Sequence, residues 1–287
     1  MCAAHTSVGP PPAPSLPLMS ASTTPGPAAG AAPALSGRTA LVTGAAGGIG
    51  RACTLRLAAA GATVLASDQD AEGLAALAAR AEKEPGLPGR VEPRVLDLTD
   101  LDAAERAAAG IDILVNNAGL QLVRPIEEFP PEVFSRVLTV MLEAPFRLVR
   151  GALPHMYAQG WGRIVNISSV HGLRASAYKA AYVTAKHGLE GLSKVVALEG
   201  AAHGVTSNCV NPAYVRTPLV ERQIADQAAA HGISPERVVS EIMLADSAVK
   251  RLIEPEEVAE AVAYLCGPDA SFITGASLAM DGGWTAH

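Results

Sequence analysis

Residues 39–50 read Thr-Ala-Leu-Val-Thr-Gly-Ala-Ala-Gly-Gly-Ile-Gly, and this stretch decides the fold. Its apolar start predicts a buried strand, and the Ala- and Leu-rich residues that follow predict a helix. Gly44, Gly48 and Gly50 allow a tight turn and a close approach of the backbone to a ligand. The helix start would offer free N–H groups to a pyrophosphate. The pattern favours a dinucleotide-binding turn over a P-loop, because no Gly-Lys-Ser/Thr follows, and over a purely structural turn.

The chain from residue 38 onward repeats this strand–helix alternation. We expect further strands at residues 63–67, 91–96, 111–116, 163–167, 206–210 and 277–280. Helices are expected near residues 50–60, 71–83, 101–109, 131–159, 182–202 and 255–266. Apolar strands separated by helices are typical of a parallel sheet covered on both faces. The prediction is one α/β domain over residues 38–287 with a doubly wound, Rossmann-like parallel sheet, and a mobile substrate lid near residues 214–250.

Residues 1–37 differ in composition from the rest of the chain. They contain no Asp, Glu, Lys or Arg and are rich in Pro, Ala, Ser and Thr. Such a segment is predicted to be disordered, either as a dispensable extension or as a recognition segment. It lacks both the basic start with a long apolar run of a secretory signal and the arginines of a mitochondrial presequence. We therefore expect a cytoplasmic protein.

The overall charge and the cysteines exclude several classes of function. The chain has 28 acidic and 22 basic residues, a net charge of −6 and a pI near 5.7. This balance argues against a nucleic acid or an anionic membrane as partner. The longest apolar runs are too short to span a bilayer. The four cysteines are far apart and the histidines show no ligand spacing, so neither a disulfide framework nor a metal site is expected.

An acidic residue follows the second predicted strand, which bears on the choice of cofactor. Asp68 lies 18 residues after Gly50, where an acid can meet the adenosine ribose hydroxyls. Its charge would repel a 2′-phosphate, and the glycine turn contains no Lys or Arg that would neutralise one. The sequence therefore predicts NAD rather than NADP, although a solvated loop acid is the alternative. Asp97, after the third strand, is placed to reach the adenine.

Three residues form a candidate catalytic group. Tyr182 and Lys186 are four apart at the start of a predicted helix, so both lie on one face. A tyrosine pKa near 10 is too high for proton transfer at neutral pH, but a nearby ammonium and the positive ring of oxidised nicotinamide would both favour the phenolate and lower that pKa. Ser169 follows the fifth strand, at the edge where a doubly wound sheet binds ligands. An exposed pair on a helix is the alternative for the tyrosine and the lysine.

Taken together, these motifs resemble those of the short-chain dehydrogenases/reductases over about residues 37–285. The matching motifs are 43–50, Asn116-Asn117-Ala118-Gly119, Ser169 and Tyr182-x-x-x-Lys186. The resemblance implies that Tyr182 transfers the proton, Lys186 binds the nicotinamide ribose and Ser169 orients the substrate. It also implies a homotetramer, with the helices near 131–159 and 182–202 and the last strand at its interfaces. The implied cofactor contacts are Gly44, Gly48, Ile49, Gly50, Asp68, Asp97, Leu98, Asn117, Ala118, Gly119, Tyr182, Lys186, Pro212, Val215 and Thr217.

Within that family, residues 117–121, 169–173, 217–224 and 281–285 are similar to those of members that act on (R)-3-hydroxybutyrate. The resemblance implies that this substrate is interconverted with acetoacetate. The implied substrate contacts are Gln121, Ser169, His171, Lys179, Tyr182 and Gln223. A buried carboxylate needs charge-assisted hydrogen bonds, which Lys179 can supply from one turn before Tyr182. The alternatives are a dehydrogenase of another small hydroxy acid or secondary alcohol, a 3-oxoacyl thioester reductase, and a non-catalytic NAD-binding regulatory protein.

One position departs from the family pattern. Members usually have a catalytic asparagine where this chain has Met141, and a thioether is only a weak acceptor. Pro145 lies four residues later and has no N–H, so it removes the helical partner of the carbonyl of residue 141. Our hypothesis is that this carbonyl binds a relay water without the asparagine.

Overall fold

The computed structural model describes residues 32–286. Within that range seven strands form one sheet in which every neighbouring pair is parallel. The order β3-β2-β1-β4-β5-β6-β7 reverses between β1 and β4, which confirms the doubly wound fold. The strands are β1 (Thr39–Thr43), β2 (Thr63–Asp68), β3 (Arg90–Val95), β4 (Ile113–Asn116), β5 (Gly162–Ile167), β6 (Val205–Pro212) and β7 (Ser277–Met280).

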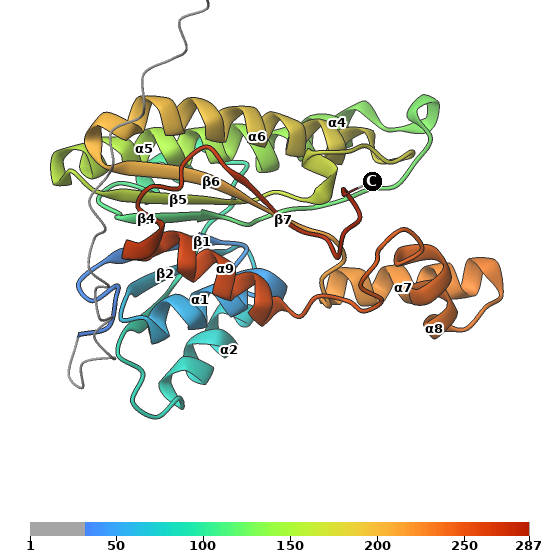
Figure 1. The fold of residues 1–287 in the computed structure, drawn as a ribbon, viewed down its shortest axis with the longest axis horizontal. Helices are drawn as coiled ribbons and strands as arrows, with labels where there is room; N and C mark the ends of the chain where they lie inside the picture. Colours follow the sequence, from blue (N-terminus) through green and yellow to red (C-terminus); the bar gives the residue numbers. More distant parts are fainter. Residues whose placement is uncertain (1–31, 287) are drawn as a thin grey trace, which may run out of the picture. The chain divides into compact units, whose positions relative to one another are not determined.

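Helices cover both faces of the sheet (Figure 1). The layer below the sheet in that view holds α1 (Gly48–Ala59), α2 (Ala71–Glu82) and α9 (Pro255–Cys266). The layer above it holds α4 (Pro131–Leu138), α5 (Ala144–Gln159) and α6 (Ala180–Gly200). Helix α3 (Leu101–Ala107) packs against α5. None of the helices in the described part of the chain has the length and apolar character that crossing a membrane requires.

The strands are buried on both sides because successive side chains point to opposite faces. Val42 packs in the cluster that contains Leu57 of α1 and Val262 of α9. Its neighbour Leu41 packs with Leu148 of α5 in a second cluster. An apolar strand with no polar alternation therefore reflects two cores, one on each face.

The expected boundaries agree with the structure to within two residues, except in the helix predicted over 131–159. Between α4 and α5 the segment η2 (Thr139–Glu143) is π-helical, and the N–H of Ala144 donates to the carbonyl of Thr139, five residues back. Pro145 has no N–H with which to continue an α-helical ladder. The irregularity coincides with Met141.

The packed domain begins before the predicted boundary at residue 37. Leu35 is 1% exposed and packs in the α1 cluster, and its N–H donates to the carbonyl of Ala60 at 2.8 Å. A single apolar side chain in a charge-free stretch has no periodicity that would reveal this contact. The disorder predicted for residues 1–31 lies outside the described residues.

The segment predicted as a lid forms a small helical unit after β6. It contains α7 (Pro218–His231), α8 (Pro235–Arg237) and the π-helical η5 (Val238–Met243). The unit has an apolar cluster of its own, which includes Val220, Ile224, Val238 and Leu244. Val215 pairs with Ile253 in an isolated parallel bridge, so the two ends of the segment meet at one point. The predicted mobility stays a prediction.

Candidate active site

The turn between β1 and α1 has no room for side chains at Gly44, Gly48 and Gly50. A Cβ on Gly50 would lie 2.1 Å from the carbonyl oxygen of Gly44. A Cβ on Gly48, whose φ is +52°, would lie 2.9 Å from Cγ2 of Thr217. Gly47 precedes the helix without providing a side-chain cap, so the first N–H groups of α1 are available to an anion. The turn fits a phosphate group bound against the backbone.

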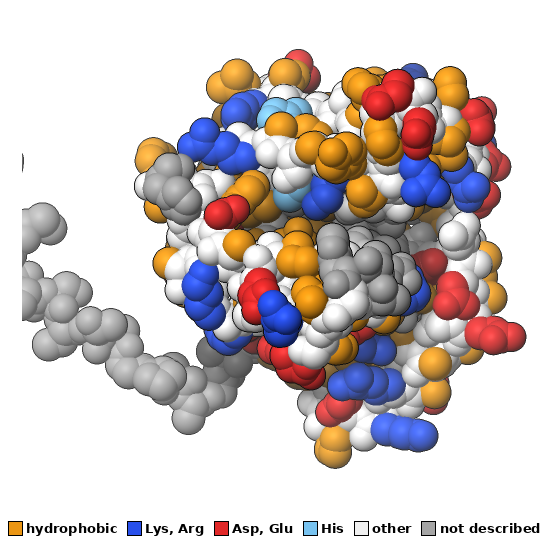
Figure 2. All heavy atoms as spheres, turned by 90° about the vertical axis from the view of Figure 1, so that its right-hand side faces the viewer, with side chains coloured by type: hydrophobic (Ala, Val, Ile, Leu, Met, Phe, Trp, Pro, Cys, Tyr) orange, Lys and Arg blue, Asp and Glu red, His pale blue; other side chains and the backbone are white. Residues whose placement is uncertain are grey.

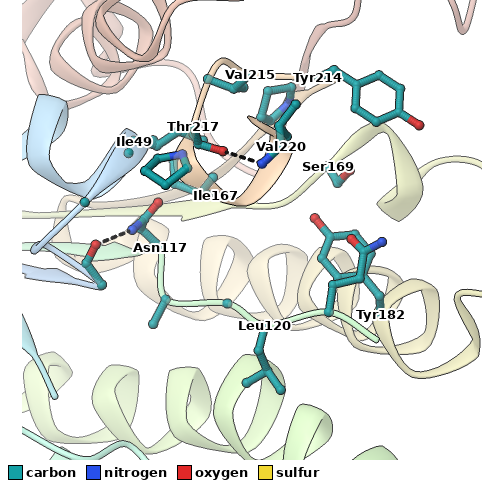
Figure 3. A pocket seen from close by; sticks show the side chains of 18 of the residues that line it. Ile49, Asn117, Leu120, Ile167, Ser169, Tyr182, Tyr214, Val215, Thr217 and Val220 are labelled. Carbon is teal, nitrogen blue, oxygen red and sulfur yellow. Dashed lines mark hydrogen bonds between the residues drawn. The ribbon is translucent and has the colours of Figure 1, made fainter. Parts of the chain in front are cut away.

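Neighbouring strand ends hold this turn in place. Oδ2 of Asp68 accepts a hydrogen bond from the N–H of Ala46 at 3.1 Å. Asn117, after β4, donates from Nδ2 to the carbonyl of Thr43 at 2.8 Å. The same Nδ2 donates to the carbonyl of Gly44 at 3.1 Å (Figure 3). The side chain of Asn117 is thus engaged with the turn itself.

A cavity of about 600 Å³ opens beside the turn, at the carboxyl ends of the strands. A second cavity of about 210 Å³ lies next to it, and Asp97 and Leu98 line its wall. Every predicted cofactor or substrate residue lines one of these cavities except Gly50, which lies against Gly44. The side of the molecule on which α7 lies mixes acidic, basic and apolar side chains, without a large patch of one charge (Figure 2). Among the described residues, no group of three His, Cys, Asp or Glu side chains could hold a metal ion.

The three candidate catalytic residues meet in the larger cavity. Ser169 follows β5, whereas Tyr182 and Lys186 lie on the first turns of α6. The side chains of Ser169 and Tyr182 point into the same space (Figure 3). Nζ of Lys186 lies 5.5 Å from the ring centroid of Tyr182 and donates to the carbonyl of Ile167 at 2.6 Å. The arrangement allows proton transfer at the tyrosine hydroxyl next to a fixed ammonium.

Burial is the largest influence on the pKa values of Tyr182 and Lys186. It raises the pKa of Tyr182 above its ordinary value, whereas the neighbouring Ser169 hydroxyl acts in the opposite direction. Burial lowers the pKa of Lys186 to about 8, although Cys209 and Glu190 oppose that shift. The expectation that the ammonium lowers the pKa of the tyrosine is therefore not met in the protein alone, because desolvation outweighs it. Bringing that pKa toward neutrality requires further positive charge in the cavity.

A lysine–histidine pair lies in the same cavity. Nζ of Lys179 is 3.2 Å from Nε2 of His171. Because an ammonium has only donors, Nε2 accepts and the ring proton lies on Nδ1. Burial, followed by the charges of Lys179 and His187, lowers the pKa of His171 to about 4, so the ring is neutral at pH 7. Burial also lowers the pKa of Lys179. The pair offers an ammonium and a ring N–H to an anion.

Backbone strain fixes the position of Lys179. The preceding residue, Tyr178, has a φ of +68° and is the one non-glycine residue with positive φ in the described chain. Its carbonyl accepts a hydrogen bond from the N–H of Arg124 at 2.9 Å. Such conformations are costly and persist where the surrounding structure holds them, often at functional sites. Here the turn leaves Lys179 at the N-cap of α6, on the wall of the cavity.

Two glutamines complete the wall. Nε2 of Gln121 is buried and, among the described residues, has no hydrogen-bond partner. An unsatisfied buried donor costs about 1–3 kcal/mol, which an acceptor bound in the cavity would remove. Gln223 reaches the cavity from α7. Both amides therefore suit a ligand with oxygen acceptors.

Sequence reasoning missed three side chains on this site. The ring of Trp284 stacks on that of His171, with centroids 5.8 Å apart and planes 15° apart. The ring centroid of Tyr214 lies 5.7 Å from Nζ of Lys179. Arg51, directly after the glycine turn, lines the larger cavity. The position of Arg51 next to the turn could have signalled it, whereas the two aromatic contacts depend on tertiary packing.

Met141 packs against residues next to the cavity. Its side chain is 1% exposed, and its sulfur accepts the N–H of Leu120 at 3.4 Å. It packs with Ala181 and Ala185 of α6, in a cluster that Tyr182 also contacts. The thioether therefore positions the loop that leads to Gln121.

A glycine turn without side chains, a free helix start and the Ser169–Tyr182–Lys186 group together define a nicotinamide-dependent dehydrogenase. A sequence profile described as Enoyl-(Acyl carrier protein) reductase matches residues 44–285. The chain belongs to the short-chain dehydrogenase/reductase family, which confirms the resemblance seen in its motifs.

Two curated relatives and one solved structure illustrate the similarity. A D-beta-hydroxybutyrate dehydrogenase from Rhizobium meliloti (strain 1021) is 47% identical over 258 residues, which cover 87% of this chain and 99% of the relative. A protein of the same name from Cupriavidus necator is 41% identical over 257 residues, which cover 88% of this chain and 100% of the relative. The structure is described as an NAD(P)-dependent gluconate 5-dehydrogenase from Beutenbergia cavernae with NADP bound at low occupancy. It has a TM-score of 0.80 and 36% identity, covering 90% of this chain and 100% of that one. The names of the two relatives and of the solved structure thus agree on dehydrogenase chemistry and differ in substrate.

Proposed function

We propose that this dehydrogenase interconverts (R)-3-hydroxybutyrate and acetoacetate with NAD. The observation that carries the proposal is that one cavity holds Ser169, Tyr182, the Lys179–His171 pair and the buried Nε2 of Gln121, which has no partner among the described residues. A four-carbon hydroxy acid has one carboxylate and one reacting hydroxyl. The donors of Lys179, His171 and Gln121 suit the carboxylate. The Ser169–Tyr182 pair suits the reacting hydroxyl. The names of the two curated relatives support the same substrate.

The catalytic roles follow from the positions of the side chains. In oxidation, Tyr182 as phenolate takes the hydroxyl proton while Ser169 donates a hydrogen bond to the substrate oxygen. Lys186 stabilises the phenolate and would hold the nicotinamide ribose. When bound, the oxidised nicotinamide supplies the hydride acceptor. In reduction, Tyr182 returns the proton.

The carboxylate would be held by residues from separate segments. Lys179 supplies the positive charge, and His171 and Gln121 supply N–H donors. Gln223 joins from α7, so substrate binding would favour closure of the predicted lid over the cavity and exclude water.

The preference for NAD rests on Asp68. Asp68 lines the cavity beside the glycine turn, and its charge would repel a 2′-phosphate bound next to it. Arg51 lines the same cavity and could neutralise one, and the solved structure described above holds NADP. A ratio of kcat/KM with NAD to that with NADP well above one in the native protein, reversed in Asp68→Ser, would support the role of Asp68. A native preference for NADP would reject it and assign the phosphate to Arg51.

The test of the substrate is a set of initial rates of NADH or NADPH formation by the purified protein. (R)- and (S)-3-hydroxybutyrate are each offered with NAD and with NADP, and 2-butanol and a longer 3-hydroxy acid serve as comparison substrates. Turnover of the R isomer with NAD in clear excess over all other combinations is the expected result. Faster turnover of the neutral alcohol, or no turnover of the R isomer while NADH still binds, would contradict the proposal.

We further propose that the protein is a homotetramer. Apolar side chains are exposed on α5 and α6, where Leu198 is 82% exposed, and near the sheet edge at β7, where Phe272 is fully exposed. Two such faces on one subunit fit the two interfaces of a tetramer with dihedral symmetry. Light scattering coupled to size-exclusion chromatography would give four times the chain mass, whereas the mass of a monomer would contradict the assignment.

A further inference from the structure

Glu190 of α6 is a buried charged side chain that the proposed reaction does not use. It is 5% exposed and lies one helical turn after Lys186. A carboxylate is costly to bury unless hydrogen bonds or an opposite charge compensate its desolvation. Its surroundings therefore indicate what it does.

Two strands hold the two oxygens of this carboxylate. Oε1 accepts a hydrogen bond of 2.6 Å from Nδ2 of Asn211, at the end of β6. Oε2 accepts one of 2.6 Å from Oγ of Ser277 on β7. The same Nδ2 of Asn211 donates to the backbone carbonyl of Ser169 at 2.9 Å. Through one amide, Glu190 is thus linked to the backbone of the residue that carries the proposed catalytic hydroxyl.

The carboxylate also packs tightly beneath the loop that carries His171. A Cβ on Gly172 would begin 2.9 Å from Oε1 of Glu190 and 2.5 Å from Oγ of Ser168. No side chain fits at Gly172 without displacing one of these oxygens. The position of Glu190 is therefore fixed by packing as well as by hydrogen bonds.

The other charged groups around α6 leave Glu190 as the anion that faces the buried lysine. From α6 itself, Tyr182 and Glu190 lie near Lys186, and from β6 the thiol of Cys209 does. Burial raises the pKa of that thiol, so it is neutral. The N-cap of α6 contributes the cation Lys179, which lines the same cavity, and the loop before it contributes His171, whose low pKa leaves it neutral. The segments α4, η2 and α5 also pack on α6. Of their acidic and basic residues, Arg147 is paired with Asp102 and Glu105. The others are exposed, namely Glu132, Arg136, Glu143 and Arg150.

We propose that Glu190 is a positioning residue whose buried charge keeps Lys186 protonated and whose hydrogen bond to Asn211 fixes the backbone of Ser169. The proposal rests on the catalytic roles assigned above to Ser169, Tyr182 and Lys186. Loss of the charge would lower the pKa of Lys186, because a nearby anion favours the ammonium. Since Lys186 acts as an ammonium in the proposed reaction, the alkaline limb of the pH–activity profile would move toward acid.

The test is the pH profile of kcat for oxidation in Glu190→Gln, which keeps the shape of the side chain and removes its charge. We expect the profile to move to lower pH by about half a unit to one unit, with KM for NAD changed less than about threefold. Glu190→Asp keeps the charge and should return the profile to its native position, even if kcat falls at all pH values. If Glu190→Gln does not fold, Glu190→Met carries the same expectation.

Glu199→Gln is the matched control, because it removes the same charge from the exposed end of α6 and should leave the profile in place. A profile of Glu190→Gln that coincides with the native one, or that moves toward alkaline pH, would overturn the proposal. The comparison uses whichever hydroxy substrate the native protein oxidises. A wrong substrate assignment would therefore appear in the native protein, and a wrong role for Glu190 only in the variants.

Discussion

The two halves of the cavity are built in different ways. The half beside β1 and β4 is built around the backbone of the glycine turn, in which a single added Cβ at Gly50 would lie 2.1 Å from a carbonyl oxygen. The half that α7 borders is built from side chains of separate segments, namely Gln121, His171, Lys179 and Gln223. The turn leaves little room for substitution at Gly50, whereas the second half can change its ligand through single substitutions. The class of chemistry therefore depends on the first half and the choice of substrate on the second.

The largest expected effect lies where the halves meet. Tyr182→Phe removes the proton-transferring hydroxyl and should lower kcat about a thousandfold, in the range that general acid–base groups contribute. NADH should still bind, as measured by its fluorescence, because the ring remains. Tyr264→Phe, at an exposed position of α9, is the control and should be fully active. A loss of less than tenfold in Tyr182→Phe would remove this tyrosine from the mechanism.

The next effect tests the backbone half. Gly50→Ala should weaken NADH binding and destabilise the protein by about 1–3 kcal/mol, because the added methyl overlaps the turn. Gly191→Ala is the matched control, since nothing lies within 4 Å of its added Cβ, and it should be neutral or slightly stabilising. Titration of NADH and thermal unfolding measure the two quantities. Equal behaviour of the two variants would contradict the tight turn.

A smaller effect with two opposite signs tests the side-chain half. Gln121→Leu removes a buried amide that has no partner in the described structure, so the unliganded protein should be as stable as the native one or more stable. The same change should raise KM for the hydroxy acid about tenfold, because a hydrogen bond to the carboxylate is lost. Gln159→Leu, at the exposed end of α5, should change neither quantity. Loss of stability without a change in KM would make Gln121 a structural residue.

The smallest effect concerns Met141. If the backbone at the π-helical segment supports proton relay without an asparagine, Met141→Asn should change kcat only modestly. Steady-state kinetics at several pH values measure this. A gain of a hundredfold or more would indicate that the native relay is broken. Unchanged activity of Pro145→Ala would also count against the hypothesis, because that change returns a backbone N–H to the helix.

The same contrast explains what could be predicted from the sequence. The sheet and the glycine turn were predictable because local patterns encode them: apolar runs mark buried strands, and Gly48 and Gly50 mark backbone that excludes side chains. Leu35 was missed because one apolar residue has no period. The π-helical segment was missed because Pro145 was read for its lost N–H and not for the shift of the hydrogen-bond ladder.

Contacts between distant segments were the hardest to predict. The ring of Trp284 stacks on that of His171, and the carboxylate of Glu190 accepts hydrogen bonds from Asn211 and Ser277. The partners are far apart in the sequence, so no local pattern predicts these contacts. The pKa of Tyr182 was expected to fall because the charges of Lys186 and of the nicotinamide ring were counted, whereas the burial of the tyrosine itself was not. Such effects depend on how much water the packed side chains exclude, which only the three-dimensional arrangement determines.

One measurement tests most directly the claim that the side-chain half selects a carboxylate. It is the ratio of kcat/KM for (R)-3-hydroxybutyrate to that for (R)-2-butanol, with NAD, in the native protein and in Lys179→Met. Lys194→Met, on the exposed side of α6, is the control. The account predicts a native ratio of about a hundred or more. The ratio should fall at least about tenfold in Lys179→Met, because a charge-assisted hydrogen bond to the carboxylate is lost, and should stay unchanged in Lys194→Met. A native ratio near one, or a ratio unchanged in Lys179→Met, would contradict it.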